Sequence, residues 1–281
     1  MPLYPVVTPT CGILPGSGCH SGLALWHDGS MGRIVTLLNQ KGGVGKTTVT
    51  LGLASAAAQA GHRVLVVDLD PQGSSTWVLG HDPMADQPSV ADILGPDRRP
   101  LQVLMSHWGL EVDLVPASSK LQDHEAGKPK RLRRALRQVA DDYEAVLVDC
   151  PPSLGNLTMS GLIAADQALI VVEPAALGLR GIAAVADAID EVWNTHNTDL
   201  ELAGVIVNKV PPISGEADRR YDELARIVGR TTIWQPSVPQ RVIVNQAIGE
   251  RRSIHSFGAR AADVSTAFDQ LWVKVLALER N

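Results

Sequence analysis

The stretch at residues 39–48, Asn-Gln-Lys-Gly-Gly-Val-Gly-Lys-Thr-Thr, constrains this chain more than any other part of the sequence. It follows an apolar run, residues 34–38, that is typical of a buried parallel strand. It precedes an alanine- and leucine-rich segment, residues 49–60, that predicts a helix. A strand, a glycine-rich loop and a helix in this order are the setting of a phosphate-binding loop. The sequence therefore predicts a nucleotide site at this point.

The chemistry of phosphate binding explains the residue types in this loop. Glycines let the backbone turn tightly and bring its N–H groups against phosphate oxygens, and the helix that starts near Lys46 adds the positive end of its dipole. The Lys46 ammonium can reach the β- and γ-phosphates, and the Thr47 hydroxyl can ligate magnesium. The predicted nucleotide-binding residues of the loop are Gly42, Gly43, Val44, Gly45, Lys46, Thr47 and Thr48. A simple glycine turn is the alternative, and the Gly-Lys-Thr triplet with both flanks disfavours it.

Two further segments place carboxylates where predicted strands end. A strand predicted over residues 62–68 runs into Asp-Leu-Asp-Pro-Gln-Gly at residues 68–73, and a strand over residues 143–150 carries Asp149 near its end. Ligands of open α/β folds bind at this carboxyl edge of the sheet, although acids there can also cap the next helix. An acid that ends an apolar run is the Walker B arrangement. Asp149 is therefore expected to hold Mg²⁺ through a water molecule.

The loop departs from the usual phosphate-loop pattern. Gln40 replaces its first glycine, and Lys41 stands at the start of the loop instead. Together with segments 68–76 and 149–155, this loop resembles the ParA/MinD family of deviant Walker-A ATPases, and most of all its short, Soj-like partition members. The resemblance implies a single α/β domain of the P-loop NTPase class, with a doubly wound, mostly parallel sheet flanked by helices. It implies ATP and Mg²⁺ as cofactors.

The resemblance also implies roles for individual residues and partners. Lys41 would reach across an ATP-dependent homodimer to the partner's nucleotide, Asp70 would position the attacking water, and Asp68 would support the site. With Lys46, these residues would hydrolyse ATP to ADP and phosphate slowly, under stimulation by a ParB-type centromere-binding protein. The ATP state would bind double-stranded DNA without sequence preference. A chromosome- or plasmid-partition protein of this kind would be cytoplasmic and associated with the nucleoid.

Asn208 and Pro239 are the residues expected on the adenine side. Asn208 ends an apolar run, and Pro211 takes the place of the aspartate that guanine recognition needs, so adenine is predicted. Asn208 is either a base contact or a turn residue at the strand end. Pro239 lies in the stretch 237–242, which partly resembles the family's Ile-Pro-Arg stretch beside adenine, with Gln240 in place of the arginine.

DNA contact requires a local basic patch, because the net charge of -5 and the pI near 5.9 exclude a global basic field. Four arginines near the C-terminal helices are preferred, since they follow the nucleotide-side stretch 237–242. These candidates are Arg241, Arg251, Arg252 and Arg260. The second candidate is the basic segment 128–137, which predicts an amphipathic helix whose outer face either contacts nucleic acid or is merely solvated.

Residues 1–30 differ from the domain predicted at residues 31–281, because they are rich in proline and glycine and lack periodicity. We expect a flexible extension there, with a regulatory or anchoring arm as the alternative. Three cysteines without a Cys-x-x-Cys pair favour a reducing compartment such as the cytoplasm.

The end of the chain bears on membrane binding. The apolar stripe over residues 261–278 predicts core packing, and few basic residues flank it, so no membrane contact is expected. A MinD-like membrane-surface positioning ATPase is therefore a weaker alternative. Another is a metabolic ATPase with the same deviant loop, such as an amide ligase.

Overall fold

A single sheet organises the molecule. The computed structural model describes residues 32–95, 100–109, 111–124, 130–174, 180–212 and 215–278. Within these ranges the strands are β1 Arg33–Leu38, β2 Val64–Asp68, β3 Leu104–Met105, β4 Val112–Val115, β5 Ala145–Asp149, β6 Gln167–Val172, β7 Glu201–Val207 and β8 Ile233–Trp234. They form one sheet in the order β3-β4-β2-β5-β1-β6-β7-β8. Only the pairing of β3 with β4 is antiparallel, at one edge, which confirms the predicted mostly parallel sheet.

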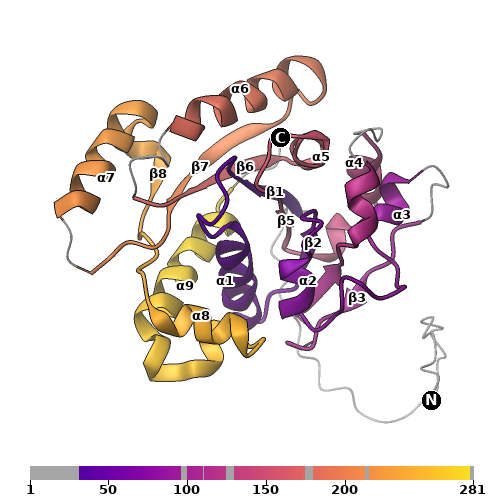
Figure 1. The fold of residues 1–281 in the computed structure, drawn as a ribbon, viewed down its shortest axis with the longest axis horizontal. Helices are drawn as coiled ribbons and strands as arrows, with labels where there is room; N and C mark the ends of the chain where they lie inside the picture. Colours follow the sequence, from indigo (N-terminus) through magenta and orange to yellow (C-terminus); the bar gives the residue numbers. More distant parts are fainter. Residues whose placement is uncertain are drawn as a thin grey trace, which may run out of the picture.

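Helices flank this sheet on both faces (Figure 1). The α-helices of the described ranges are α1 Lys46–Gln59, α2 Ser74–Val78, α3 Val90–Leu94, α4 Lys130–Leu136, α5 Asn156–Ala164, α6 Arg180–Thr195, α7 Gly215–Val228, α8 Val242–Gly249 and α9 Ala262–Leu276. Short 3-10 helices are η1 Ser119–His124, η2 Ala140–Asp142, η3 Arg230–Thr232 and η4 Ile254–Ala261.

The sheet separates two hydrophobic cores. Along β6, Ala168, Ile170 and Val172 belong to the core shared with α3 to α7, whereas Leu169 and Val171 belong to the core shared with α1, α8 and α9. Successive side chains of a strand point to opposite faces, so a strand covered on both sides is apolar throughout. This double burial is why the central strands were recognisable as unbroken apolar runs in the sequence.

The C-terminal helix α9 packs on α1, the helix that follows the glycine loop. Its buried side chains are Val264, Ala267, Phe268, Leu271, Trp272 and Val275, which confirms the predicted core stripe. A Cβ atom at position 52 would lie 2.3 Å from the Phe268 ring, so Gly52 permits this close approach. No helix within the described ranges is long and apolar enough to cross a membrane.

Several elements had no sequence prediction. They include α2, α5, α7, α8 and the two-residue strands β3 and β8. Helix α5 is buried almost all round, so no amphipathic period marks it. The helix predicted over residues 128–137 is α4, and residues 128–129 lie outside the described residues. The extension predicted over residues 1–30 also lies outside them.

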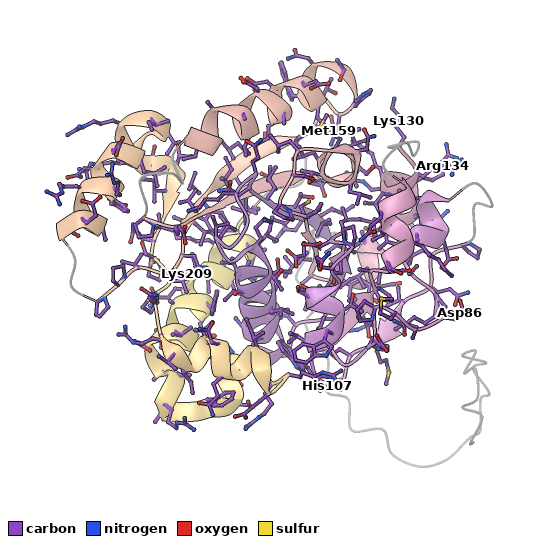
Figure 2. All side chains as sticks on the ribbon, in the orientation of Figure 1. Asp86, His107, Lys130, Arg134, Met159 and Lys209 are labelled. Carbon is purple, nitrogen blue, oxygen red and sulfur yellow. The ribbon has the colours of Figure 1, made fainter. Side chains whose placement is uncertain are left out.

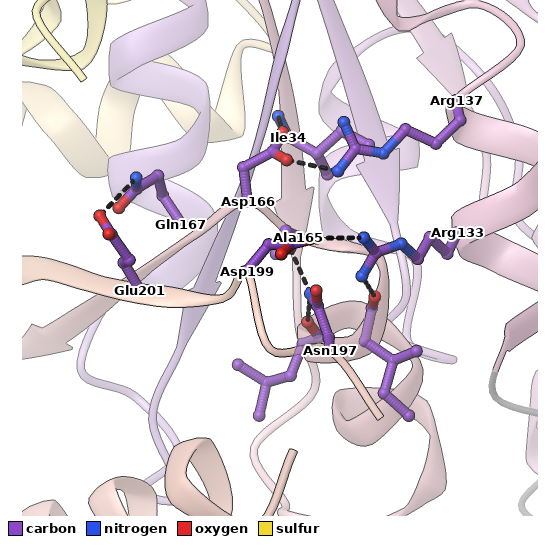
Figure 3. Close-up of polar contacts among 11 residues, drawn as sticks. Ile34, Arg133, Arg137, Ala165, Asp166, Gln167, Asn197, Asp199 and Glu201 are labelled. Carbon is purple, nitrogen blue, oxygen red and sulfur yellow. Dashed lines mark hydrogen bonds and ion pairs between the residues drawn. The ribbon is translucent and has the colours of Figure 1, made fainter. Parts of the chain in front are cut away.

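A polar network fixes the amino edge of the sheet, where β1 and β6 begin (Figure 3). Asp166 accepts a hydrogen bond from the Ile34 amide at 2.8 Å and forms an ion pair with Arg137, which directly follows α4. Arg133 of the same helix donates to Asp199 at 3.1 Å. We call Asp166, Arg137, Arg133 and Asp199 the amino-edge network. It connects the α4 segment to the amino ends of the strands, whereas the glycine loop lies at their carboxyl ends.

Candidate nucleotide-binding site

The glycine loop between β1 and α1 is shaped as an anion cradle. Gly43 and Gly45 adopt left-handed backbone angles, with φ of 80° and 92°, which favour glycine. Helix α1 begins at Lys46, and no side chain among the described residues caps its N-terminus. Its first N–H groups are therefore open to a ligand, and the helix dipole favours a negative one.

The end of β7 holds the middle of this loop. The Asn208 amide nitrogen donates to the Val44 carbonyl at 2.9 Å, and the Lys209 ammonium donates to the Gly43 carbonyl. A Cβ atom on Gly45 would lie 2.1 Å from that Asn208 nitrogen, so only glycine fits there. Asn208 is buried; its side chain contacts the loop, and its backbone amide donates to the Val172 carbonyl at 2.7 Å. Lys209 was assigned no role from the sequence, although it directly follows Asn208 at the end of β7.

The end of β6 holds the start of the loop. The Asn39 side chain donates to the Val171 carbonyl at 2.7 Å and accepts a hydrogen bond from the Lys41 amide at 2.9 Å. The Lys41 ammonium forms an ion pair with Glu173, which directly follows β6. The side chains of Lys41 and Glu173 are 30% and 22% exposed.

Lys46 places a buried cation at the centre of the site. Its exposure is only 7%. Burial lowers the pKa of its ammonium, whereas the charge of Asp149, which comes next in size, acts to raise that pKa. A charge with so little access to water interacts more strongly with a bound phosphate than a surface lysine does.

Asp149, at the carboxyl end of β5, is buried with one oxygen unused. Its Oδ2 accepts hydrogen bonds from the Thr47 and Ser75 hydroxyls, both at 2.7 Å. Its Oδ1 has no hydrogen-bond partner among the described residues. Burial raises the pKa of Asp149 to about 6, while the two hydroxyls act to lower it. Ser75 was assigned no role from the sequence; its only signal was its place within segment 68–76.

Asp68 and Asp70 stand beside Asp149 at the same edge. Asp68 lies opposite Asp149 in the register of β2 and β5 and is fully buried. It accepts hydrogen bonds from the amide and hydroxyl of Thr76, both at 2.8 Å, and from the Asp70 amide at 3.1 Å. Burial, followed by the nearby charge of Asp149, raises the pKa of Asp68 to about 8. The carboxylate of Asp70 accepts a hydrogen bond from the Gln72 amide at 2.9 Å.

The donor set at Asp149 fits magnesium. It offers an unpartnered carboxylate oxygen beside the Thr47 and Ser75 hydroxyls, which are the hard oxygen ligands that Mg²⁺ prefers. No group of three or more His, Cys, Asp or Glu side chains that could hold a metal occurs in the described ranges. Water and phosphate oxygens would therefore complete the shell, as is usual for Mg²⁺ with nucleotides.

The segment around Pro239 runs beside the end of β7. Pro239 bridges Val210 in parallel fashion, and the Gln240 amide donates to the Val210 carbonyl at 2.7 Å. This bridge places Pro239 on the same side of the site as Asn208. The fold thus brings together the two residues that were predicted on the adenine side.

The candidate DNA-binding arginines differ in exposure. Arg252 and Arg260 are exposed and both lie over the Phe257 ring, at 4.5 and 5.8 Å from its centroid. Arg241 is partly buried and pairs with Asp263 at 2.7 Å.

Arg251 is integrated into the fold. Its backbone is left-handed, with φ of 57°, and its guanidinium lies 5.3 Å from the centroid of the Trp77 ring. His107 and Trp108 contact its carbonyl oxygen at 2.6 and 3.1 Å. The exposed basic surface of this region is therefore formed by Arg252 and Arg260.

In segment 130–137, which contains helix α4 and is the second DNA candidate, most of the basic residues contact other parts of the fold. Arg131 donates to the Leu94 carbonyl at 2.8 Å, and Arg133 and Arg137 belong to the amino-edge network. Lys130 and Arg134 point outward (Figure 2). The basic outer face predicted for this segment is thus reduced, within the described residues, to these two side chains.

Comparisons with known proteins identify a family and relatives that this chain resembles. A family model described as an AAA domain matches residues 32–202. The sporulation initiation inhibitor protein Soj of Bacillus subtilis is 31% identical over 85% of this chain and 96% of its own length. The chromosome partitioning protein ParA of Myxococcus xanthus is 34% identical over 77% of this chain and 78% of its own.

A solved structure extends the comparison to ligands. Cobyrinic acid a,c-diamide synthase from Mycobacterium smegmatis, with a bound ATP analogue and magnesium, superposes with a TM-score of 0.73. It is 28% identical, over 86% of this chain and 93% of its own. The expected cofactors, ATP and Mg²⁺, agree with the ligands of that protein.

Proposed function

The chain belongs to the AAA domain family, within its ParA/MinD group of ATPases with a deviant phosphate loop, and on that basis we propose that it is a partition ATPase that forms a homodimer around ATP. The domain responsible would span residues 31–281. The observation that carries the proposal is the open oxygen of Asp149 beside Thr47, at the head of a loop that begins with Lys41.

The residues at the carboxyl edge divide the work of phosphoryl transfer to water, which requires mainly positioning and charge stabilisation. The loop amides and Lys46 bind the phosphates. Thr47 and Asp149 hold Mg²⁺, which when bound neutralises charge on the phosphate oxygens. Asp70 orients the attacking water, and Asp68 supports it through the hydrogen bond to the Asp70 amide.

Lys41 acts across the dimer in this proposal. Each subunit donates its Lys41 ammonium to the partner's nucleotide, where it stabilises the charge that develops during transfer. Hydrolysis is then coupled to dimerisation, because a monomer lacks one of the cations that the reaction needs. Asn208 supports the loop, and Pro239 lies beside the adenine.

The ATP-bound dimer would bind double-stranded DNA through phosphate contacts, without sequence preference. The exposed pair Arg252 and Arg260 supports this surface better than Arg251. Such contacts make affinity fall with salt, by about 0.9 in the log–log slope for each phosphate contact. A ParB-type protein would stimulate hydrolysis, and the protein would act in the cytoplasm at the nucleoid.

Phosphate release from the full chain tests this proposal. We expect slow release with ATP and Mg²⁺, and faster release when random duplex DNA and a candidate ParB-type protein are added. The Asp70→Ala variant should bind ATP and dimerise but release no phosphate. Asp86→Ala, which removes an acid that is 98% exposed, should behave as wild type. Wild-type turnover in Asp70→Ala contradicts the role of Asp70.

DNA retention tests the second half of the proposal. Arg252→Glu with Arg260→Glu should remove binding to random duplex and leave ATP-dependent dimers unchanged. Lys130→Glu with Arg134→Glu changes the same number of charges on α4 and should retain binding. Retained binding in the first double variant and lost binding in the second would instead assign the DNA-binding surface to α4. Failure of the wild type to bind DNA in every nucleotide state would contradict partition.

A metabolic ATPase is the second candidate, favoured by the likeness to the cobyrinic acid a,c-diamide synthase. An enzyme of that kind would couple ATP cleavage to amide formation on a carboxylic acid substrate. Its ATP turnover would depend on that acid and an amide donor, whereas the turnover of a partition ATPase depends on DNA and a protein partner. Phosphate release measured with each set of additions separates the two.

A further inference from the structure

The ammonium of Lys41 is already engaged within its own subunit. It forms an ion pair with Glu173, which lies 132 positions away in the chain and directly follows β6. The proposed role of Lys41 requires the same ammonium to reach the phosphates of a partner's nucleotide. The carboxylate of Glu173 and the partner's triphosphate would therefore compete for one cation.

The start of the loop is held independently of this ion pair. The Lys41 amide donates to the Asn39 side chain, and Asn39 is anchored on the Val171 carbonyl of β6. The Lys41 side chain can thus leave Glu173 while its backbone stays in place. The other side-chain contacts to the loop, from Asn208 and Lys209, involve backbone carbonyls further along it.

The ion pair is poised for exchange. Both side chains are partly exposed, and ion pairs in such positions contribute little net stability because water screens them. A triphosphate with bound Mg²⁺ still carries a net negative charge, so it offers Lys41 a stronger partner than a single carboxylate does.

We propose that Glu173 is a positioning residue that retains Lys41 in its own subunit and thereby sets the ATP concentration at which the dimer forms. This inference rests on the proposed function, since it concerns the delivery of Lys41 to a partner's nucleotide. Glu173 opposes dimerisation because each Lys41 must leave its carboxylate before it contacts the partner.

Removal of the carboxylate tests the inference. Glu173→Gln should increase the ATP-dependent dimerisation constant by about two- to fivefold for each lysine released, the factor expected for a partly exposed ion pair. ATP affinity of the monomer should not change, because Lys46 and the loop amides are untouched. The measurement is dimer formation by light scattering with ATP and Mg²⁺, beside titration with a fluorescent ATP analogue.

Two controls make the test specific. Glu144→Gln alters the net charge equally at the opposite edge of the sheet, directly before β5, and should leave dimerisation unchanged. Glu173→Asp keeps the charge and should dimerise more like the wild type than Glu173→Gln does.

A double-mutant cycle identifies the route of the effect. In a Lys41→Gln background, Glu173→Gln should have no further influence on dimerisation, because its only route is through Lys41. An equal gain in that background, or unchanged or weaker dimerisation in Glu173→Gln alone, overturns the inference while the proposed function stands. Wild-type protein that forms no dimer with ATP overturns both.

Discussion

Two buried aspartates at opposite edges of the same sheet differ in how their carboxylate oxygens are paired. Asp166 at the amino edge is 2% exposed, and its two oxygens bind the Ile34 amide and the Arg137 guanidinium. Asp149 at the carboxyl edge is fully buried, and one of its oxygens has no partner among the described residues. Because burial of an unsatisfied charge is costly, the carboxyl edge is held in an unfavourable state that a cation would relieve.

The two edges differ in how their acidic side chains are paired with cations. The amino-edge network pairs each of its two acids with an arginine, Asp166 with Arg137 and Asp199 with Arg133, so neither carboxylate lacks a charged partner. At the carboxyl edge, Asp68 and Asp149 face each other across adjacent strands, and Lys46 is the nearby cation. Sites of function are commonly less stable than the fold around them.

Replacing each aspartate by the isosteric asparagine should change the free energy of unfolding in opposite directions at the two edges. The largest expected effect is the loss of ATP turnover in Asp149→Asn. Asp149→Asn should lower ATP turnover by about a thousandfold, since metal-based charge stabilisation is worth several kcal/mol. It should also raise the unfolding free energy of the nucleotide-free protein, by about 1 kcal/mol, because a buried charge is removed. Phosphate release and urea unfolding measure the two quantities.

Asp166→Asn is the matched change at the amino edge. It should lower the unfolding free energy by about 2 kcal/mol, as Arg137 loses its charged partner. ATP turnover of the folded protein should persist. An equally large loss of stability in Asp149→Asn and Asp166→Asn would contradict the claim that only the carboxyl edge is held in an unfavourable state.

Removal of a cation should affect ATP affinity at the carboxyl edge and stability at the amino edge. This is the next largest expected effect. Lys46→Ala should weaken ATP binding by about a hundredfold or more, because a charged hydrogen-bonding partner of the phosphates is lost. Arg137→Ala, at the amino edge, should retain ATP affinity and lose stability instead. Titration with a fluorescent ATP analogue distinguishes them, and unchanged affinity in Lys46→Ala would show that the loop is not the site.

The pH dependence of stability should come from the carboxyl edge. The pKa of Asp68 is raised to about 8 and that of Asp149 to about 6, both above the ordinary value of 3.8. Between the ordinary value of 3.8 and these raised pKa values, the folded state therefore binds more protons than the unfolded state. The free energy of unfolding consequently falls as pH rises through this window. We expect the free energy of unfolding of nucleotide-free, Mg²⁺-free protein to fall progressively from pH 5 to pH 8.

Urea unfolding across this pH range measures how steeply the free energy of unfolding falls with pH. Asp149→Asn should flatten it, because the variant removes one titrating group and the charge that raises the pKa of Asp68. Asp166→Asn should lower stability at every pH and keep the slope. An equally steep slope in Asp149→Asn would assign the titration to another part of the molecule.

The smallest expected effect concerns the support of the loop. Lys209→Met removes the hydrogen bond to the Gly43 carbonyl and should weaken ATP binding by about five- to tenfold, the value of a single hydrogen bond. Arg133→Met removes a cation of the amino-edge network, which donates to Asp199, and should leave ATP affinity unchanged. Equal ATP affinities in the two variants would show that Lys209 does not position the loop.

The candidate site residues that could be predicted from the sequence are those marked by local order along the chain. Lys46 and Thr47 are recognisable because the glycines before them and the helix after them are contiguous in the chain. Asp149 is recognisable because it ends an apolar strand, and the carboxyl ends of parallel strands meet at one edge. The central strands were found for a related reason, since burial on both faces makes them continuously apolar.

Other features depend on residues far apart in the chain. Ser75 binds Asp149 over a separation of 74 positions, and Lys209 binds Gly43 over 166. The arginines of segment 128–137 were expected on an outer face, yet Arg131 and Arg133 donate to partners in other elements. Charge and period place a residue on a helix but do not specify what lies beside it.

The sequence by itself determined the class of fold, the phosphate loop and the acids that end the strands, because each is written in neighbouring residues. Only the tertiary structure decided that Asp149 keeps one oxygen without a partner among the described residues, that Asn208 supports the loop and that Glu173 pairs with Lys41. These contacts join the ends of different strands. Their partners are fixed by the order and register of the sheet, which bring distant segments together only after the chain has folded.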